Sequence, residues 1–212
     1  MKKIILVLLI GILGLSCEKK EDDNLALLAA LALGSSSPVS ATHVSLNRIY
    51  LTTSVITGGN LGGISGADAR CSSDGNKPST GTYKAMIVSG TTRRACSTAN
   101  CGGGSSENID WVLKPSTKYY RADGTTEIFT TNAAGIFVYG TATNTISNTS
   151  VGVWTGVNID WTNTAGDCTA WTSTAGTTGR GSAAFNTSDD MISIDQAAAC
   201  TASAYSLYCV EQ

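Results

Sequence analysis

The chain has 212 residues, of which only 14% are charged, and its 14 lysines and arginines against 16 aspartates and glutamates give a formal net charge of −2. Without a block of basic residues it lacks the cations that neutralise phosphates, so we expect no nucleic-acid partner. A single histidine excludes a multi-histidine metal site, and the length allows one domain with a sizeable core.

Residues 1–16 predict an export signal. A positively charged start is followed by an apolar run over residues 4–15, and the small Ser16 stands before Cys17. The run is shorter than the roughly 20 apolar residues that a membrane-spanning helix needs. Because residues 13–17 resemble a bacterial lipobox, we expect lipidation of Cys17, and two acyl chains hold a protein on a membrane. The alternative is a leader cleaved elsewhere or not at all, in which Cys17 is an ordinary cysteine.

A tether is expected over residues 17–41. It begins with the charged residues 18–23 and ends in the serine-rich residues 34–38, and neither stretch has apolar surface to bury. Between them, Leu25–Leu33 consists of strong helix formers but is short and apolar all round. This run either lies on the membrane surface or packs on the domain, which we expect to span residues 42–212.

Six of the seven cysteines fall in that domain. An even number of cysteines in an exported chain predicts three disulfides. They are Cys71, Cys96, Cys101, Cys168, Cys200 and Cys209. The short spacing of Cys96 and Cys101 suits a small local ring, and a bridge between Cys71 and Cys209 would contribute about 4 to 5 kcal/mol in the chain-entropy model. Structural zinc is the alternative, but the sequence has no clustered C-x-x-C pairs.

The domain is rich in threonine, serine and glycine and contains short stretches of β-branched and aromatic residues that predict strands. These stretches cover residues 49–53, 83–88, 127–129, 135–139, 152–155 and 206–210. Helices are expected over residues 64–73, with Ser65 as a cap, and over residues 105–113. The predicted class is α+β with long loops.

A tetrapeptide occurs twice. Asn108–Trp111 and Asn158–Trp161 both read Asn-Ile-Asp-Trp, but the residues that follow them differ. We interpret the recurrence as a coincidence of loop chemistry rather than an internal repeat.

Both ends of the domain carry a resemblance to a known family. Residues 63–71, 81–89 and 199–212 resemble endostatin, a divergent C-type-lectin-like fold, and residues 153–156, 168–171 and 177–181 fall between them in the same order. The similarity spans about residues 42–212. Together with the leader, the chain is similar to the leptospiral endostatin-like outer-membrane lipoproteins. The resemblance implies a disulfide-stapled C-type-lectin-like domain.

That resemblance also implies a disulfide pairing. It joins Cys71 to Cys209 and Cys168 to Cys200, leaving Cys96 and Cys101 for each other. The zinc site of endostatin uses a histidine-rich N-terminus, whereas this chain has only His43, so the metal is not carried over and no cofactor is expected.

For function, the resemblance implies adhesion and immune evasion at the cell surface, with an anchor in the outer membrane. Members of the family are similar in binding laminin, fibronectin, complement factor H and plasminogen, and no enzymatic activity accompanies the resemblance. A carbohydrate-binding lectin module, with or without calcium, and an envelope structural lipoprotein remain the alternatives.

The candidate ligand-binding residues are Lys84, Arg93, Arg94, Trp111 and Trp161. Arg93 and Arg94, with Lys84, form the densest basic spot and are expected to be an exposed pair. The small ring either presents this pair to an acidic host surface, or the pair simply belongs to a solvated turn. Because Trp111 and Trp161 both follow aspartate in polar surroundings, we expect them to be open to solvent, and we expect Trp154 and Trp171 in the core.

Two further kinds of site, a catalytic site and a calcium site, are not expected. His43 could serve a nucleophile, but no Gly-x-Ser-x-Gly elbow accompanies it, so a surface histidine is expected. Calcium needs roughly six to eight converging oxygens. The acids that could supply some of them are Asp160, Asp167, Asp189 and Asp190. The tripeptides of calcium-dependent lectins are absent from the sequence, so we expect these acids to be solvated loop residues.

Overall fold

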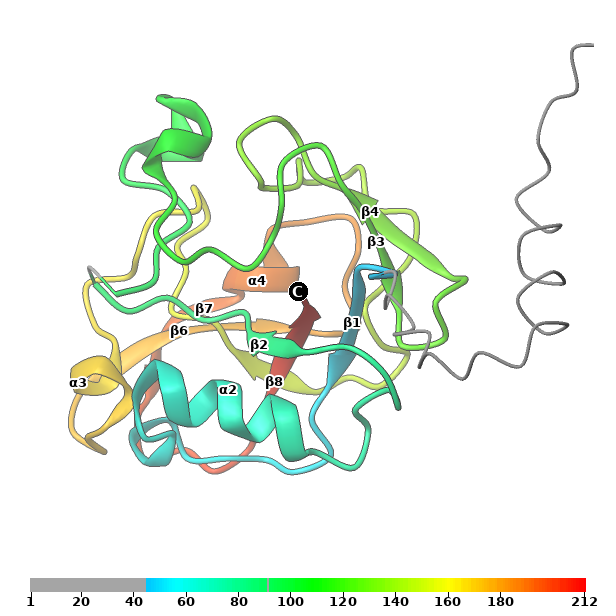
Figure 1. Ribbon diagram of the computed structural model, residues 1–212. Helices are drawn as coiled ribbons and strands as arrows, with labels where there is room; N and C mark the ends of the chain where they lie inside the picture. The colour runs from blue at the N-terminus through cyan, green and yellow to red at the C-terminus, as the bar shows by residue number, and fades with distance from the viewer. Residues whose placement is uncertain (1–44, 91) are drawn as a thin grey trace, which may run out of the picture. The chain divides into compact units, whose positions relative to one another are not determined.

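The computed structural model describes residues 45–90 and 92–212. In this part of the chain, a mixed sheet of eight short strands forms the centre of the domain (Figure 1). The strands are β1 Arg48–Leu51, β2 Tyr83–Ala85, β3 Lys118–Arg121, β4 Glu127–Thr130, β5 Gly152–Trp154, β6 Thr177–Ser182, β7 Asp195–Ala199 and β8 Tyr205–Glu211. Their order is β4-β3-β1-β8-β5-β6-β7, and β2 pairs with β8. The export signal, Cys17, the tether and His43 lie outside the described residues.

The last strand holds the sheet together. β8 is buried from Ser206 to Glu211 and pairs antiparallel with β1 and β2 and parallel with β5. Each partner covers a different part of β8: Tyr50 lies opposite Cys209, for example, whereas Trp154 lies opposite Leu207. β8 therefore joins strands from the beginning and the middle of the chain.

Five of the predicted strands are present as β1, β2, β4, β5 and β8, but the prediction for residues 135–139 is wrong. That segment has no strand and instead places Ile136 and Phe137 in the core as a loop. β6 was not predicted as a strand, because it contains two glycines. A Cβ on Gly181 would lie 2.2 Å from the carbonyl oxygen of Met191, so the glycine permits close packing of the following helical turn.

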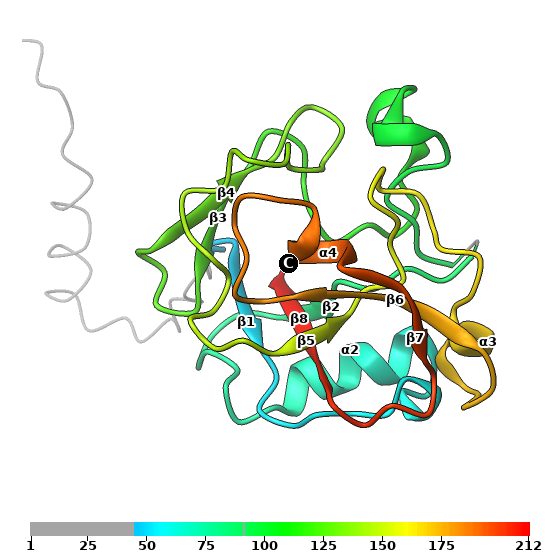
Figure 2. The same cartoon turned by 180° about the vertical axis from the view of Figure 1, so that it is seen from behind.

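The predicted helix is confirmed as α2, Gly63–Ser73, which packs along the sheet (Figure 2). Its N-cap is Gly62 with φ 77°, so the expected Ser65 cap is wrong. The helix expected over residues 105–113 is also mostly wrong. It is a 3₁₀ turn, Gly104–Glu107, that ends because Asn108 has extended backbone with ψ 139°.

The three disulfides join the same pairs that the resemblance implied. Cys71 is bonded to Cys209, Cys168 to Cys200, and Cys96 to Cys101. The first bond fastens α2 to β8, the second fastens the turn α3 (Cys168–Trp171) to the residue after β7, and the third closes a local ring. The domain is therefore α+β and stapled by disulfides.

α3 has an unusual backbone, because all four of its residues have positive φ between 52° and 65°. A left-handed conformation costs about 1 to 2 kcal/mol per residue with a side chain. Asp167 supports this turn by accepting hydrogen bonds from the Ala170 and Trp171 amides at 2.8 and 2.7 Å. The disulfide of Cys168 and the buried indole of Trp171, which donates to the Val88 carbonyl at 2.8 Å, fix both ends.

The core consists of two apolar clusters. One gathers around Trp154 and Trp171, which are buried as predicted. The other contains Phe129, Phe137 and Trp161 and includes residues of both β4 and the long loops.

No helix among the described residues is long and apolar enough to cross a membrane.

One turn of helix, α4 Asp190–Ser193, completes the regular structure, together with short 3₁₀ turns over Gly58–Asn60 and Ala99–Cys101. α4 packs on β6.

Candidate binding surface

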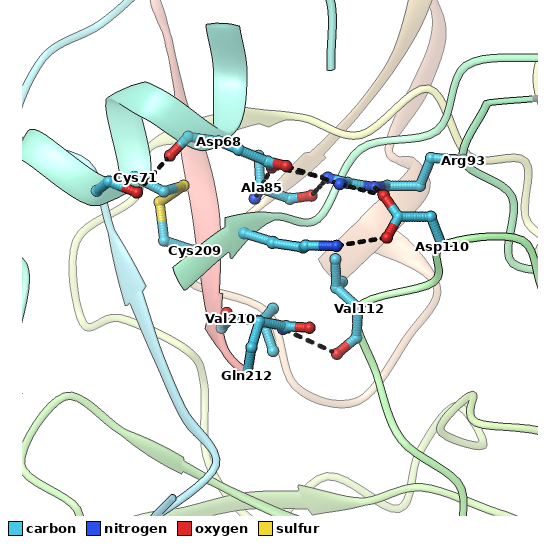
Figure 3. Close-up of polar contacts among 11 residues, drawn as sticks. Asp68, Cys71, Ala85, Arg93, Asp110, Val112, Cys209, Val210 and Gln212 are labelled. Atoms are coloured by element: carbon cyan, nitrogen blue, oxygen red, sulfur yellow. Dashed lines mark hydrogen bonds and ion pairs between the residues drawn. A yellow bond between two sulfur atoms is a disulfide. The ribbon is translucent and has the colours of Figure 1, made fainter. Parts of the chain in front are cut away.

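Arg93 is at the centre of a charge network that joins three segments of the chain (Figure 3). Its guanidinium donates from Nη1 and Nη2 to the two carboxylate oxygens of Asp68 on α2, both at 2.8 Å. On the other side, Nη2 and Nε donate to Asp110 Oδ2 at 2.5 and 3.0 Å. Arg93 is only 1% exposed. The expectation of an exposed Arg93 is therefore wrong, because two carboxylates from distant segments enclose it.

The same network binds the outer side of β2. The Ala85 amide donates to Asp68 Oδ1 at 2.8 Å, and the Ala85 carbonyl accepts from Arg93 Nη1 at 2.8 Å. Lys84, the preceding residue, forms an ion pair with Asp110 and keeps 37% of its side chain exposed. The network therefore fixes Lys84 at the surface while it ties β2 to α2 and to the 109–111 segment.

Asp110 carries its negative charge firmly in this setting. Burial raises the pKa of its carboxyl, but the hydrogen bonds from Lys84 and Arg93 and their positive charges outweigh the burial, so the pKa lies below its ordinary value.

Trp161 is buried rather than open. It is 1% exposed and packs edge-on against Phe137 at a centroid distance of 4.8 Å and face-to-face with Tyr139 at 6.0 Å. The expectation of an open Trp161 fails because its φ of 69° closes a turn, with its amide bonded to the Asn158 carbonyl, and the ring enters the core. Trp111 meets Trp161 edge-on at 6.3 Å and is half-buried, with its indole donating to the Gly135 carbonyl at 2.9 Å.

The two Asn-Ile-Asp-Trp segments thus meet in space but differ in conformation. In the first segment Asp110 has positive φ, and in the second Trp161 does. The difference supports the interpretation that they are not copies of one structural unit.

Glu107 organises the disulfide ring of Cys96 and Cys101. Its carboxylate accepts from the Ser97, Thr98 and Gly103 amides at 2.6, 2.7 and 2.5 Å, and also from the Ser97 and Thr98 hydroxyls. These hydrogen bonds lower the pKa of Glu107 to about 2, and the bond from the Thr98 hydroxyl has the largest effect. Glu107 was not among the predicted site residues, because an acid shortly after a C-x4-C pair is a weak signal.

The ring loop and the loop after β5 lie side by side (Figures 1 and 2). The Asn100 amide donates to the Asp160 carbonyl at 2.7 Å, and Cys96 pairs with Thr162 as an isolated bridge. Ile159 is 50% exposed in the turn that leads to Trp161. Backbone contacts therefore join the two loops.

Of the five candidate residues, three remain partly exposed around the 109–111 segment. Lys84 pairs with Asp110, Arg94 exchanges backbone hydrogen bonds with Ile109 at 2.9 and 3.0 Å, and Trp111 follows directly. We call these three residues the Lys84–Arg94–Trp111 surface. Arg93 and Trp161 lie beneath it and position it.

The four acids considered for calcium have separate structural roles. Asp160 accepts from the Thr162 amide and hydroxyl, Asp167 holds α3, and Asp189 and Asp190 stand at the start of α4. In the part of the chain that the structure describes, no group of three or more histidine, cysteine, aspartate or glutamate residues is arranged to hold a metal ion.

Comparison with known proteins gives a family for the chain. A family model described as "Protein of unknown function (DUF1554)" matches residues 54–188, which is more than half of the chain and includes the whole Lys84–Arg94–Trp111 surface. No curated protein matches. On the strength of the family match, the chain belongs to the DUF1554 family.

Proposed function

We propose that the protein is a lipid-anchored adhesin on the cell surface, held in the outer membrane through Cys17. Its partners are host extracellular-matrix and complement-regulatory proteins of the laminin, fibronectin, factor H and plasminogen class. Its domain is an endostatin-like member of the C-type-lectin-like fold. The resemblance at both ends of the domain supports this proposal, as does the combination of an α+β fold with three disulfides. The proposal involves no catalytic step and no cofactor.

The observation that carries the proposal is the support beneath the Lys84–Arg94–Trp111 surface. Tryptophan and arginine are enriched among residues that dominate protein–protein binding energy. Here Trp111 packs against the ring of Trp161, and Lys84 pairs with Asp110, which the buried Arg93 also binds. A surface that is already ordered loses less conformational entropy when it binds, so moderate contacts suffice for useful affinity.

Solid-phase binding of the full-length chain in detergent to immobilised laminin, fibronectin, factor H and plasminogen tests the proposal. The triple variant Lys84→Gln, Arg94→Gln, Trp111→Ala is expected to weaken binding at least about tenfold for one or more of these partners. The matched control is Lys118→Gln on β3, whose side chain is 58% exposed and which lies away from this surface. Wild-type binding should weaken as salt rises, because two of the three residues are cationic.

Three outcomes would contradict the proposal. They are absence of wild-type binding to all four partners, equal binding by the triple variant and wild type, and binding that needs calcium and is competed by simple sugars. The last outcome would favour a lectin.

A further inference from the structure

A concave site of about 440 Å³ lies beside β1 and the end of β3. Its volume is in the usual range of ligand sites, about 300 to 1,000 Å³. Ile49, Leu51 and Ile146 give it apolar walls, and Arg121 and Asp123 are its charged residues. The β3–β4 side of the domain, where this site lies, is opposite the ring loop in both views (Figures 1 and 2), so the site is separate from the Lys84–Arg94–Trp111 surface.

Arg121 is held in place by uncharged groups. Its Nε donates to the Thr145 carbonyl at 2.8 Å, and its Nη2 donates to the Thr145 hydroxyl at 2.6 Å and to Asn148 Oδ1 at 3.0 Å. These three bonds fix the plane of the guanidinium. Its remaining nitrogen, Nη1, has no hydrogen-bond partner among the described residues, so the two N–H groups of Nη1 are available to a ligand.

The positive charge of Arg121 is also uncompensated within the described chain, where no carboxylate lies within ion-pair distance of it. Three other arginines differ, because Arg48 pairs with Glu211, Arg93 with Asp68 and Asp110, and Arg180 with Asp195. An oriented guanidinium without a counter-ion, in a concave site, is suited to an anionic ligand with an oxygen that accepts a charge-assisted hydrogen bond from Nη1.

Asp123 restricts which anion the site accepts. Hydrogen bonds from the Thr126 amide and hydroxyl and from the Thr125 amide lower the pKa of its carboxyl to about 2, so it is charged at neutral pH. This second charge repels a phosphate dianion more than a carboxylate with one negative charge. The carboxylate of Asp123 and the side-chain amide oxygens in the lining can accept hydrogen bonds from N–H groups. A peptide supplies such N–H groups, together with apolar groups that can contact the apolar walls of the site.

We infer that the site around Arg121 binds a carboxylate of a peptide, with the guanidinium as the carboxylate receptor. The carboxylate is either the C-terminus of the peptide or an aspartate or glutamate side chain. This binding does not depend on the Lys84–Arg94–Trp111 surface and goes beyond the adhesin proposal.

Calorimetric titration of the full-length chain in detergent with small peptides tests the inference and separates the two sources. The first pair of probes is acetyl-Ala-Ala-Ala with a free C-terminus and the same peptide as its amide. The second pair is acetyl-Ala-Glu-Ala-amide and acetyl-Ala-Gln-Ala-amide. In at least one pair, the carboxylate probe is expected to bind at least about tenfold more tightly than the neutral probe. The pair that shows the difference identifies the source.

Variants assign the binding to this site. Arg121→Gln removes the receptor, and Thr149→Glu places a competing carboxylate in the same site without removing any bond of Arg121. Both variants should lose the binding at least about tenfold. Thr149→Glu decides the matter if Arg121→Gln fails to fold. Arg70→Gln is the control, since Arg70 is an exposed arginine that donates only to the Asn60 carbonyl.

The inference is overturned if carboxylate and neutral probes bind equally, if no probe binds, or if Thr149→Glu leaves binding unchanged. It is also overturned if inorganic phosphate binds as tightly as the better peptide, which would mark a general anion site. The triple variant of the Lys84–Arg94–Trp111 surface should bind the peptides like wild type. Failure of the adhesin proposal therefore leaves this result intact, and the reverse also holds.

Discussion

Single residues with buried charges determine where the candidate surface can be. Arg93 lies under Lys84 and beside Asp110 with 1% of its surface exposed. A buried guanidinium is tolerated only when its charge is paired and its N–H groups are bonded, and Arg93 meets both conditions. Its role in the molecule is to position other residues.

Replacing Arg93 with methionine keeps the approximate length of the side chain and removes its charge. Removal of one partner from a fully buried ion pair costs about 3 to 5 kcal/mol. Asp68 and Asp110 are 22% and 39% exposed in their side chains, so water can solvate them again in the variant. We therefore expect a smaller loss, about 2 to 3 kcal/mol of the free energy of unfolding, measured with urea. Arg70→Met should change that free energy by less than about 0.5 kcal/mol, and equal values would contradict this account.

Two glycines with nearly the same backbone angle separate conformational cost from steric cost. Gly81 and Gly176 have φ of 91° and 87°. A Cβ on Gly81 would lie 2.5 Å from Oε1 of the buried Glu211, whereas a Cβ on Gly176 meets nothing within 4 Å. Gly176→Ala is expected to lower the free energy of unfolding by about 1 to 2 kcal/mol. Gly81→Ala should cost about 1 to 3 kcal/mol more, because it also disturbs the pair of Glu211 with Arg48.

Thermal or urea unfolding of both alanine variants provides the measurement. Equal losses would show that Glu211 moves away freely and that the close contact at Gly81 carries no cost.

At the scale of elements, the ring loop shows how a carboxylate can do the work of regular structure. Residues 96–104 have no strand ladder, and three of their amides and two of their hydroxyls bind Glu107 instead. Such bonds to a charged acceptor are stronger than bonds between neutral groups. The loop order therefore depends on the charge of one side chain.

The pH dependence of stability follows from the same carboxylate. The pKa of Glu107 is about 2 in the folded protein and near its ordinary value of 4.5 when unfolded. Its contribution to stability is fully present above about pH 4.5 and is lost as the pH falls towards 2. In Glu107→Gln we expect a smaller drop in the free energy of unfolding across this window than in wild type.

Urea unfolding at several pH values between 5 and 2.5 measures the difference. Glu127→Gln on β4 is the control: it removes a partly exposed carboxylate that pairs with Lys118, and its profile should differ from wild type less than that of Glu107→Gln does. Asp123, whose pKa is also about 2, contributes equally to all three proteins. Coincident profiles of Glu107→Gln and wild type would contradict the role assigned to Glu107.

The sequence allowed prediction of the elements with strong local signals. α2 and the apolar strands β1 and β8 have such signals in helix-forming or β-branched residues. β6 and β7 do not, because Thr-Thr-Gly-Arg-Gly-Ser and Asp-Gln-Ala-Ala-Ala are poor strand sequences that acquire their conformation from pairing partners.

The candidate surface was predictable only in part, because some of its contacts join residues that are far apart in the sequence. Lys84 and Trp111 are partly exposed, and Arg94 is too. The burial of Arg93 depends on Asp68, which is 25 residues earlier in the chain, and the burial of Trp161 depends on Phe137. Neither contact leaves a local signal, so both residues were placed at the surface.

At the scale of the whole molecule, the disulfides span very different lengths of chain. Cys71 and Cys209 are 138 residues apart, Cys168 and Cys200 are 32 apart, and Cys96 and Cys101 are 5 apart. The chain-entropy model gives stabilisation of about 5, 4 and 2 kcal/mol for loops of these lengths.

Paired cysteine-to-serine replacements should therefore destabilise the domain in that order. The loss is expected to be largest without the bond between Cys71 and Cys209 and smallest without the bond in the ring. Urea unfolding of the three double variants under oxidising conditions measures the order. A ring variant that is less stable than the Cys71→Ser, Cys209→Ser variant would show that native contacts, rather than loop length, determine the effect.

The proposed anchor makes a prediction for the full chain in its cell. Cys17→Ala removes the residue that would carry the acyl chains, so the protein should leave the membrane fraction for the soluble fraction. Immunoblots of the two fractions measure the change. Cys96→Ser is the control, because a cysteine within the domain should not affect anchoring. Membrane retention of Cys17→Ala would refute the lipid anchor.

The side-chain bonds to Ala85 have a consequence for a protein that is held on a membrane, as proposed for this one. Tethered copies meet often, and an unpaired strand margin invites a neighbouring chain to join a growing sheet. On the outer margin of β2, the N–H and C=O of Ala85 are already occupied by Asp68 and Arg93. An incoming strand would have to displace a buried arginine to bond there. If the chain is anchored as proposed, the network beneath the candidate surface also helps neighbouring copies to stay separate.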